Sequence, residues 1–411
     1  MTAHQQSVMK RVLFCPLTLS SKRFLVFLLC VSLIYLGLYN YDISLPDKYT
    51  GFAVGDWLIN YAGGFVRRGL SGSLLIPLAH MFGIRPEISV MLVKIFLYSV
   101  IYIGMALFIM RCQSLRVVDA FIIFSPAYLL FPILGTVGGG RKEILLLAWV
   151  TYQLLQAQRG RKLPSDALIS VLFFLLTFLH EGIVFFLPLA YIVVHRIYDV
   201  AVNANKAIIT LAPSLFYVIL LLLLPHTSDE AMIRAIAQAI DPVNYTQWIN
   251  GAILELTHSF RHGVDWVKGG ITSWTFFSIA IAVVLFAFPF LTLDKSEYFF
   301  RLLPQDKWML IAAFMLQLPI FLIAVDWGRW LYIDASLLSM YYLSTHTTSA
   351  PNIVMILKDN AIKFSQLAIL ILCLTLHITS WQLKSCCTIG AIAGITPIIL
   401  HKALIHQETQ K

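Results

Sequence analysis

Charged residues are scarce in this chain of 411 residues: 12% are charged, whereas 59% are hydrophobic. Soluble domains carry about 25% charged residues, and a chain this apolar could not cover its surface with polar groups in water. The composition excludes an ordinary soluble enzyme and favours a membrane protein, whose apolar side chains face lipid. No hydrophilic segment is long enough for a soluble domain, so residues 1–411 are predicted to form a single integral membrane domain.

Cysteine frameworks and metal-binding patterns are also lacking. The six cysteines suggest no disulfide framework, and the adjacent Cys386 and Cys387 do not have the spacing of metal ligands. Neither Asp-x-Asp nor His-x-x-His occurs, so we expect no metal and no cofactor. The net charge of +9 does not indicate nucleic acid in such a chain, because positive residues at membrane edges set orientation and attract anionic lipid.

Apolar runs are abundant. Many extend over roughly 16 to 23 residues, close to the length that crosses a hydrocarbon core. The first has no small-residue cleavage site after it, so we interpret it as an uncleaved span. The sequence therefore predicts an all-α bundle of 11 or 12 transmembrane helices, at 24–39, 88–110, 117–135, 143–157, 165–179, 182–195, 207–224, 271–292, 308–325, 331–345 and 364–380, with a weaker span at 388–403.

Two consecutive spans, 165–179 and 182–195, are short. Together they have too many residues for one crossing and few for two, given a rise of about 1.5 Å per residue. They predict either a tight hairpin or two half-helices interrupted at His180-Glu181-Gly182.

Lysine and arginine set the predicted orientation. With the N-terminus in the cytoplasm and the spans alternating, most of the 30 lysines and arginines fall in cytoplasmic segments, as the positive-inside rule expects. The C-terminus is then cytoplasmic too if the twelfth segment crosses. The same alternation puts every unusual polar motif on the outer face: Gly55-Asp56-Trp57, Gly64 to Gly69, Gly138 to Glu143, His180-Glu181-Gly182, Arg261 to Trp266 and Asp326 to Trp330.

Two outer loops are large, 41–87 and 225–270. In the first, apolar residues recur at helical spacing from Leu70 to Phe82, which predicts an interfacial helix lying on the membrane. In the second, a short helix is predicted from Ser228 to Ile240, where Asp241-Pro242 ends it.

Arginines on the outer face run against the positive-inside bias. Guanidinium groups keep their charge and bind phosphate in bidentate fashion, and the glycines before Lys142 could present backbone amides to an anion. The alternative is that each arginine snorkels to lipid phosphate or pairs with a nearby carboxylate. The candidate phosphate-binding residues are Arg67, Arg68, Arg141, Lys142 and Arg329.

Carboxylates accompany these arginines. Sugar transfer to a hydroxyl needs a carboxylate or histidine that accepts the proton, and each of Asp56, Glu143, Glu181 and Asp326 could serve. We select Asp56, His180, Glu181 and Asp326 as candidate catalytic residues. The alternatives are a hydrated hairpin tip at His180-Glu181 and a simple pair between Asp326 and Arg329, three residues apart. Tryptophans 57, 248, 266, 327 and 330 fit an aromatic belt, with sugar stacking as the other interpretation.

The arrangement resembles bacterial membrane enzymes of surface-polysaccharide assembly, namely Wzy-type O-antigen polymerases and polyprenol-dependent glycosyltransferases of the GT-C superfamily. The resemblance lies in size, span number and loop layout over the whole chain. GT-C enzymes place a catalytic Asp or Glu in the first outer loop, a position that Asp56 occupies. Wzy-type polymerases have functional outer arginines, to which Arg67, Arg68, Arg141, Arg261 and Arg329 correspond by location.

This resemblance implies a GT-C-like bundle in the bacterial inner membrane that transfers or polymerises sugars from undecaprenyl-linked donors on the periplasmic face. The implied partners are the polyprenyl-linked saccharide, the bilayer and other polysaccharide-assembly membrane proteins. A precursor flippase is the alternative, although charges within the spans are scarce for a transporter. A non-catalytic scaffold would tolerate replacement of Arg67, Arg68, Glu181 and Arg329.

Overall fold

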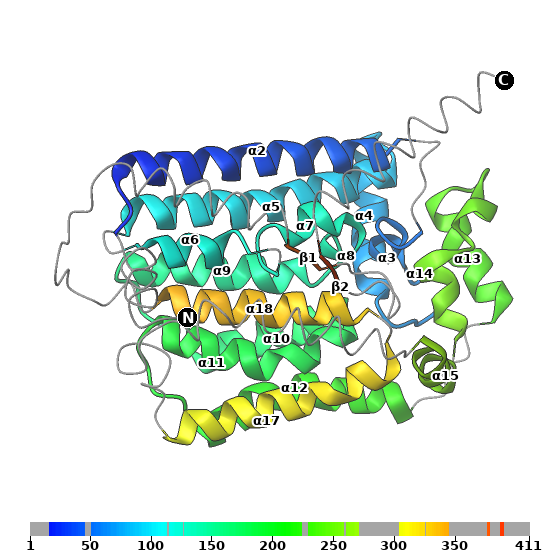
Figure 1. The fold of residues 1–411 in the computed structure, drawn as a ribbon. Helices are drawn as coiled ribbons and strands as arrows, with labels where there is room; N and C mark the ends of the chain where they lie inside the picture. The colour runs from blue at the N-terminus through cyan, green and yellow to red at the C-terminus, as the bar shows by residue number, and fades with distance from the viewer. Residues whose placement is uncertain are drawn as a thin grey trace.

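The computed structural model describes residues 16–45, 51–112, 115–125, 127–223, 229–258, 260–270, 304–324, 326–344, 376–378 and 387–389. Three helices in this part of the chain are long and apolar enough to cross a membrane: α2 (Leu19–Ile43), α5 (Pro86–Arg111) and α12 (Ala204–Leu223). Beside them lie α9 (Ile144–Gln158), α10 (Asp166–Leu179), α11 (Leu187–Ile197), α17 (Pro304–Ile323) and α18 (Trp327–Ser344), which complete a layered helical bundle (Figure 1). The predicted span 271–292 lies outside the described residues.

Contacts at the two ends of the bundle fix the direction of the first helices. Arg85, just before α5, donates a hydrogen bond of 2.7 Å to the carbonyl of Ser44, just after α2. At the opposite end, Lys22 in the first turn of α2 donates to the carbonyl of Cys112, just after α5, at 2.6 Å. The two helices are therefore antiparallel, as successive crossings require. We call the end that contains Ser44 and Arg85 the site end.

The segment 117–135 is not the single helix that the sequence predicts, and that prediction is wrong. It holds α6 (Val117–Ile123), then turns, and then the short α7 (Phe131–Leu134) and α8 (Thr136–Gly139). Proline has no amide hydrogen and its ring clashes with the preceding turn of a helix, and the sequence carries prolines at 126 and 132. Apolar composition alone does not reveal such a break.

The chain reverses direction at His180-Glu181-Gly182. Of the two predicted arrangements, the structure thus has the hairpin and not two half-helices. The α10 helix starts after Ser165, whose side chain accepts from the Leu168 amide, and it ends before His180. A 3₁₀ helix, η1 (Glu181–Phe186), then leads into α11. The Tyr191 hydroxyl in α11 donates to Asp166 at the start of α10, at 3.1 Å. The two helices therefore run in opposite directions and place the reversal at the site end.

The first large loop turns back into the bundle. Its short helix α3 (Gly55–Leu58) is buried throughout, and Lys94, well inside α5 and 1% exposed, donates to the carbonyl of Ala53 at 2.6 Å. Helix α4 (Gly69–Met81) follows and covers the stretch for which an interfacial helix is predicted. It exposes a row of apolar side chains, namely Leu74, Leu78, Met81 and the adjacent Phe82.

The second large loop folds onto the first. Asp229 caps α13 (Glu230–Ile240) by accepting from the Met232 amide, and the helix ends at Asp241 as predicted. The turns η2 (Tyr245–Trp248), α14 (Gly251–Leu254) and η3 (Glu255–Thr257) lead to α15 (Phe260–Gly270). The two loops are joined by hydrogen bonds, among them one of 3.0 Å from the side-chain Nδ2 of Asn60 to the backbone carbonyl of Ile236. Figure 1 shows α13, α14 and α15 grouped beyond the same end as α3 and α4.

A short antiparallel strand pair lies late in the chain, where helical spans 364–380 and 388–403 are predicted. Strand β1 (Leu376–Ile378) pairs with β2 (Cys387–Ile389), with His377 opposite Thr388. Isoleucine and threonine favour extended backbone, and the paired strands bond to each other. Five of these six residues fall within the two predicted spans and are strand, not helix, and the remainder of both spans lies outside the described residues.

Candidate functional site

Polar residues from four separate segments meet at the site end, which is the end that the alternating spans predict for all of them. The segments are the first loop, the turn before α9, the turn between α10 and η1, and the start of α18. Their side chains are joined to one another by ion pairs, and Lys142 by hydrogen bonds to backbone carbonyls. The residues that meet are Asp56, Arg67, Arg68, Arg141, Lys142, Glu143, His180, Glu181, Asp326 and Arg329.

Asp56 is enclosed at the centre of the cluster. Its side chain is 0% exposed, with Arg68 Nη1 3.4 Å from one carboxylate oxygen and Arg141 Nε 3.2 Å from the other. Burial opposes ionisation of this carboxyl, but the charges of Arg141, Lys142 and Arg68 hold its pKa well below the usual range. Asp56 is therefore an anion that holds two guanidinium groups together, and its low basicity disfavours it as a proton acceptor.

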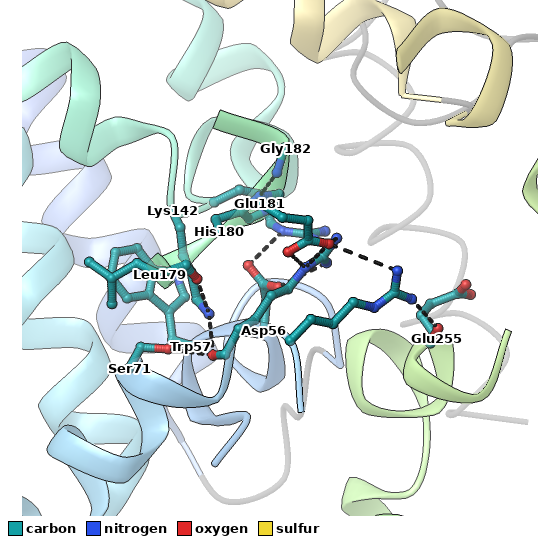
Figure 2. A network of polar contacts seen from close by, with 12 residues as sticks. Asp56, Trp57, Ser71, Lys142, Leu179, His180, Glu181, Gly182 and Glu255 are labelled. Atoms are coloured by element: carbon teal, nitrogen blue, oxygen red, sulfur yellow. Dashed lines mark hydrogen bonds and ion pairs between the residues drawn. The ribbon is translucent and has the colours of Figure 1, made fainter. Parts of the chain in front are cut away.

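Glu181 forms the strongest pair in the cluster. Arg68 Nη2 lies 2.6 Å from Glu181 Oε1, and Arg68 Nε donates to both carboxylate oxygens at 2.9 Å. Such a fork makes charge-assisted, oriented hydrogen bonds. Burial raises the pKa of Glu181, but the Arg68 guanidinium outweighs it and holds that pKa far below the usual range. Figure 2 shows the Glu181 carboxylate beside Asp56 and His180, with dashed lines leading towards Glu255.

Arg67 lies at the rim of the cluster. Its side chain is 34% exposed, and its Nη1 is 3.9 Å from Glu181 Oε1. Its Nη2 donates to the backbone carbonyl of Glu255 in the second loop at 2.9 Å. The guanidinium keeps further N–H groups that make no hydrogen bond within the described residues. Among the arginines of the cluster, this one combines a fixed position with access from outside.

Lys142 does not point outward as a phosphate ligand would. Its ammonium donates to the carbonyls of Arg68 and Leu179, at 3.1 and 3.2 Å, and the side chain is fully buried. Burial lowers its pKa to about 8. Lys142 thus fastens the first loop to the end of α10 (Figure 2). The backbone groups of the adjacent glycines are also engaged in hydrogen bonds. The carbonyl of Gly140 accepts from the Trp57 indole, and the Gly139 amide donates to the Gly135 carbonyl.

A second, looser group adjoins the first. Glu143 Oε1 lies 3.7 Å from Arg329 Nε and 3.5 Å from His180 Nε2, and Asp326 Oδ2 lies 3.1 Å from Arg329 Nη2. Neither oxygen of Glu143 makes a hydrogen bond within the described residues. Asp326 is 27% exposed, whereas Glu143 and Arg329 are buried. The pair between Asp326 and Arg329 is the one that their spacing predicts, and it is continuous with the rest of the cluster through Glu143.

The hydrogen bonds of His180 indicate its tautomer. Its Nδ1 accepts from the Gly182 amide at 3.0 Å, so in the neutral ring the proton is on Nε2, which faces Glu143. Burial, assisted by the charge of Arg68, lowers the pKa of His180 to about 4. Near neutral pH the ring is therefore an uncharged donor. Its only basic nitrogen is already engaged, which disfavours His180 as a general base.

Acid is expected to destabilise the protein through His180 over the range from pH 6.5 to 4. The folded-state pKa is about 4, below the value of about 6.5 in an unfolded chain, so the unfolded state takes up the proton first. The stability that the neutral ring contributes is complete above pH 6.5 and is lost as the pH falls. His180→Asn, whose side-chain oxygen can still accept from Gly182, should flatten the dependence of the unfolding midpoint between pH 6.5 and 5.

Unfolding of the purified protein in detergent, followed by tryptophan fluorescence at several pH values, measures this effect. The matched control is His80→Asn, because His80 is exposed on α4 and its replacement should leave the slope unchanged. Equal slopes for the wild type and His180→Asn would contradict the prediction.

Arg68 also carries backbone strain. Its φ of 66° and ψ of 6° lie in the left-handed region, although it is not glycine. Such a conformation costs about 1 kcal/mol or more in a residue with a side chain, and it is typical of functional sites. The next residue is Gly69, where a Cβ would lie 2.2 Å from the Tyr61 ring. This close packing holds Arg68 in place as α4 begins.

One member of the network, Glu143, is not among the candidate site residues predicted from the sequence, where it is one carboxylate among several. Arg261 lies apart from the network, on α15, where its exposed side chain is 4.0 Å from Asp265. Of the five tryptophans, Trp57, Trp248 and Trp330 are buried inside the protein and not in a lipid-facing belt.

The cluster carries a small positive charge. Arg67, Arg68, Arg141, Lys142 and Arg329 supply five positive charges, and Asp56, Glu143, Glu181 and Asp326 supply four negative ones, so the sum is +1 with His180 neutral. Within the described ranges, no group of three or more His, Cys, Asp and Glu side chains is placed to hold a metal ion. An oriented set of guanidinium groups is suited to holding an anion.

No protein-family model matches the chain, and neither a curated protein nor a solved structure matches it.

Proposed function

We propose that this protein transfers or polymerises sugar units from polyprenyl-phosphate- or diphosphate-linked donors at the membrane surface. The observation that carries the proposal is the joining of guanidinium groups and carboxylates from four segments at one end of an apolar helical bundle. A donor of this class combines a lipid tail, a phosphate and a sugar. Lipid-facing helices, fixed cations and an accessible carboxylate match these three parts.

In this proposal Arg67 contacts the donor phosphate. It is the most exposed arginine of the network, and the Glu255 carbonyl and Glu181 hold it in place. Arg68 and Arg141 lie behind it, paired with Asp56, and they add positive potential without direct contact. As the bond between the anomeric carbon and the phosphate oxygen breaks, its electron pair passes to that oxygen. A guanidinium group at this position stabilises the developing charge.

Asp326 is the carboxylate that we assign as the proton acceptor. It is 27% exposed and has one ion pair, with Arg329, whereas Asp56 and Glu181 are held by arginines on both oxygens. The acceptor hydroxyl gives its proton to Asp326 while its oxygen bonds to the anomeric carbon of the donor sugar. Glu143 and His180 are positioning residues, because Glu143 contacts Arg329 from the buried side and His180 in turn contacts Glu143.

The site end is assigned to the periplasmic face of a bacterial inner membrane. The opposite end gathers basic residues such as Lys22, Arg111, Arg116 and Arg196, as a cytoplasmic face does. A precursor flippase remains the competing function, since arginines in a groove could also conduct a lipid phosphate. It would move the lipid-linked saccharide without changing its covalent structure, and this difference separates the two functions.

The test is transfer by purified protein in nanodiscs supplied with undecaprenyl-diphosphate-linked repeat units of a bacterial surface polysaccharide. We expect longer lipid-linked glycans from a polymerase, or the addition of one sugar from a transferase. Asp326→Asn should lower the turnover number by about 10²- to 10⁴-fold, the usual contribution of a general base. Glu230→Gln, an exposed carboxylate on α13, is the matched control and should keep full activity.

Unchanged products with the wild-type protein, together with translocation of the same lipid in proteoliposomes, would overturn the transfer proposal in favour of the flippase. Full activity of Asp326→Asn would overturn the assignment of the base.

A further inference from the structure

Helix α15 has a polar outer face with one large aromatic side chain on it. Val267 is buried, and Gly263 packs so closely against Ile323 that a Cβ there would lie 2.5 Å from the Ile323 carbonyl oxygen. The opposite side of the helix is exposed. It presents Trp266, whose side chain is 49% exposed, among hydrogen-bonding and charged groups, namely Arg261, His262, Asp265 and Lys268.

Three aromatic rings form a continuous row along this face. The rings of His258 and His262 stack with their centroids 4.0 Å apart, and the ring of Trp266 follows with its centroid 5.9 Å from that of His262. The spacing of four residues places His262 and Trp266 on one side of α15, and His258 comes just before this helix at the end of η3. His258 and His262 cover each other's faces, so the row supports the exposed Trp266 ring from one side, and hydrogen-bonding groups lie around it.

The aromatic row connects directly to the rim of the charged cluster. His258 Nδ1 lies 2.9 Å from the carboxylate of Glu255, and the backbone carbonyl of Glu255 accepts from Arg67 at 2.9 Å. A phosphate bound at Arg67 would thus lie beside the row, and the sugars that follow it would extend along the row towards Trp266. This continuity relates the row to the substrate of the proposed reaction.

We propose that Trp266, supported by His262 and His258, forms a saccharide-binding surface that holds the glycan part of the lipid-linked substrate by stacking. The proposal rests on the proposed function, because it assigns the subsite beyond the phosphate. The apolar face of a sugar ring packs on an aromatic face while its hydroxyl groups bond to the polar side chains around it. Arg261, Asp265 and Glu255 provide such groups at the edges of the row.

The composition of this face favours a glycan over the lipid interface. A helix that lies on a membrane turns its apolar side to the acyl chains and its charges to water. In α15 the apolar side, with Val267, packs against the protein, and the exposed side carries Arg261, Asp265 and Lys268 with Trp266. An exposed tryptophan within a charged face is suited to a ligand that is flat, apolar on one face and rich in hydroxyl groups.

Glycan binding that does not depend on catalysis tests this surface. The intact protein in nanodiscs is applied to an array printed with bacterial O-polysaccharides and capsular polysaccharides, and the affinity for the best binder is measured by interferometry. We expect Trp266→Ala to weaken that affinity at least about 10-fold, the effect of losing an aromatic hot spot. Trp308→Ala is the matched control, because Trp308 is 72% exposed but lies near the start of α17, at the opposite end of the bundle.

Three results would overturn the proposal: no array polysaccharide bound by the wild type, equal affinity of Trp266→Ala and the wild type, or quenching of the Trp266 fluorescence by brominated lipids. Binding that depends on Trp266 in a protein that transfers no sugar would support this surface while refuting the proposed enzyme. Sugar transfer by a protein that shows no such binding would support the proposed enzyme and refute this saccharide-binding surface. The two proposals can therefore fail separately.

Discussion

Replacing Asp56 with asparagine is expected to lower the free energy of unfolding by about 3–5 kcal/mol, the usual effect of removing one partner of a buried ion pair. The carboxylate is completely enclosed and is the shared partner of Arg68 and Arg141. Without its charge, Arg141 stays buried near Lys94 and Lys142 with no anion between them. Unfolding in detergent followed by tryptophan fluorescence measures the loss.

The control for this substitution is Asp265→Asn, because Asp265 pairs with Arg261 on an exposed surface of α15. Exposed pairs contribute about 0.2–1 kcal/mol, so the control should remain close to the wild type. Adding Arg141→Gln to Asp56→Asn should restore part of the stability, since it removes the uncompensated charge. A loss below about 1 kcal/mol in Asp56→Asn would show that the centre of the cluster is hydrated and not sealed.

The second large effect is expected on catalysis. Arg67→Ala should lower kcat/KM for the lipid-linked donor by about 10²- to 10³-fold, because it removes a positioned donor from the charge that develops on the leaving phosphate. Arg67→Lys should recover only part of this activity, since an ammonium is a point charge and cannot make the paired hydrogen bonds of a guanidinium. Initial rates of transfer in nanodiscs, measured over a range of donor concentrations, separate kcat from KM.

Arg234→Ala is the matched control for Arg67, because Arg234 is an exposed arginine on α13 in the same outer loop. It should retain wild-type rates. An Arg67→Ala protein with unchanged kcat and KM would exclude contact between this side chain and the donor phosphate. A rise in KM with unchanged kcat would show that Arg67 binds the donor equally strongly in the ground state and in the transition state.

The shared end of the bundle was the part of the site that the sequence predicted best. Alternating spans place Asp56, Arg141, Glu181 and Arg329 at one end, and the structure brings them together there. Chain direction reverses at each crossing, so residues far apart in sequence can be assigned to a common face without any contact being known. The hairpin at His180 is one of the two alternatives that the sequence left open, because the two runs are too long for one crossing and short for two.

Individual pairings could not be predicted in the same way. Which carboxylate holds which guanidinium depends on distances of a few ångströms, and the interior position of Lys142 depends on carbonyls from two other segments. The break within 117–135 was hidden because hydropathy records transfer to lipid and not the hydrogen bonds that proline removes. Buried tryptophans were likewise indistinguishable from an interfacial belt, since both environments suit a large apolar ring.

The unequal lengths of the helices have a consequence for the surrounding lipid. The 25 residues of α2 would extend about 37 Å, whereas the 14 residues of α10 extend only about 21 Å. A hydrocarbon layer about 30 Å thick exceeds the length of α10, which exposes Leu168, Val171 and Leu175, and thinning of the bilayer is one way in which such a mismatch is accommodated. Under the proposed function, such thinning would lower the headgroups next to the hairpin towards Arg67, so that the prenyl phosphate of the donor could reach the guanidinium groups without leaving its leaflet.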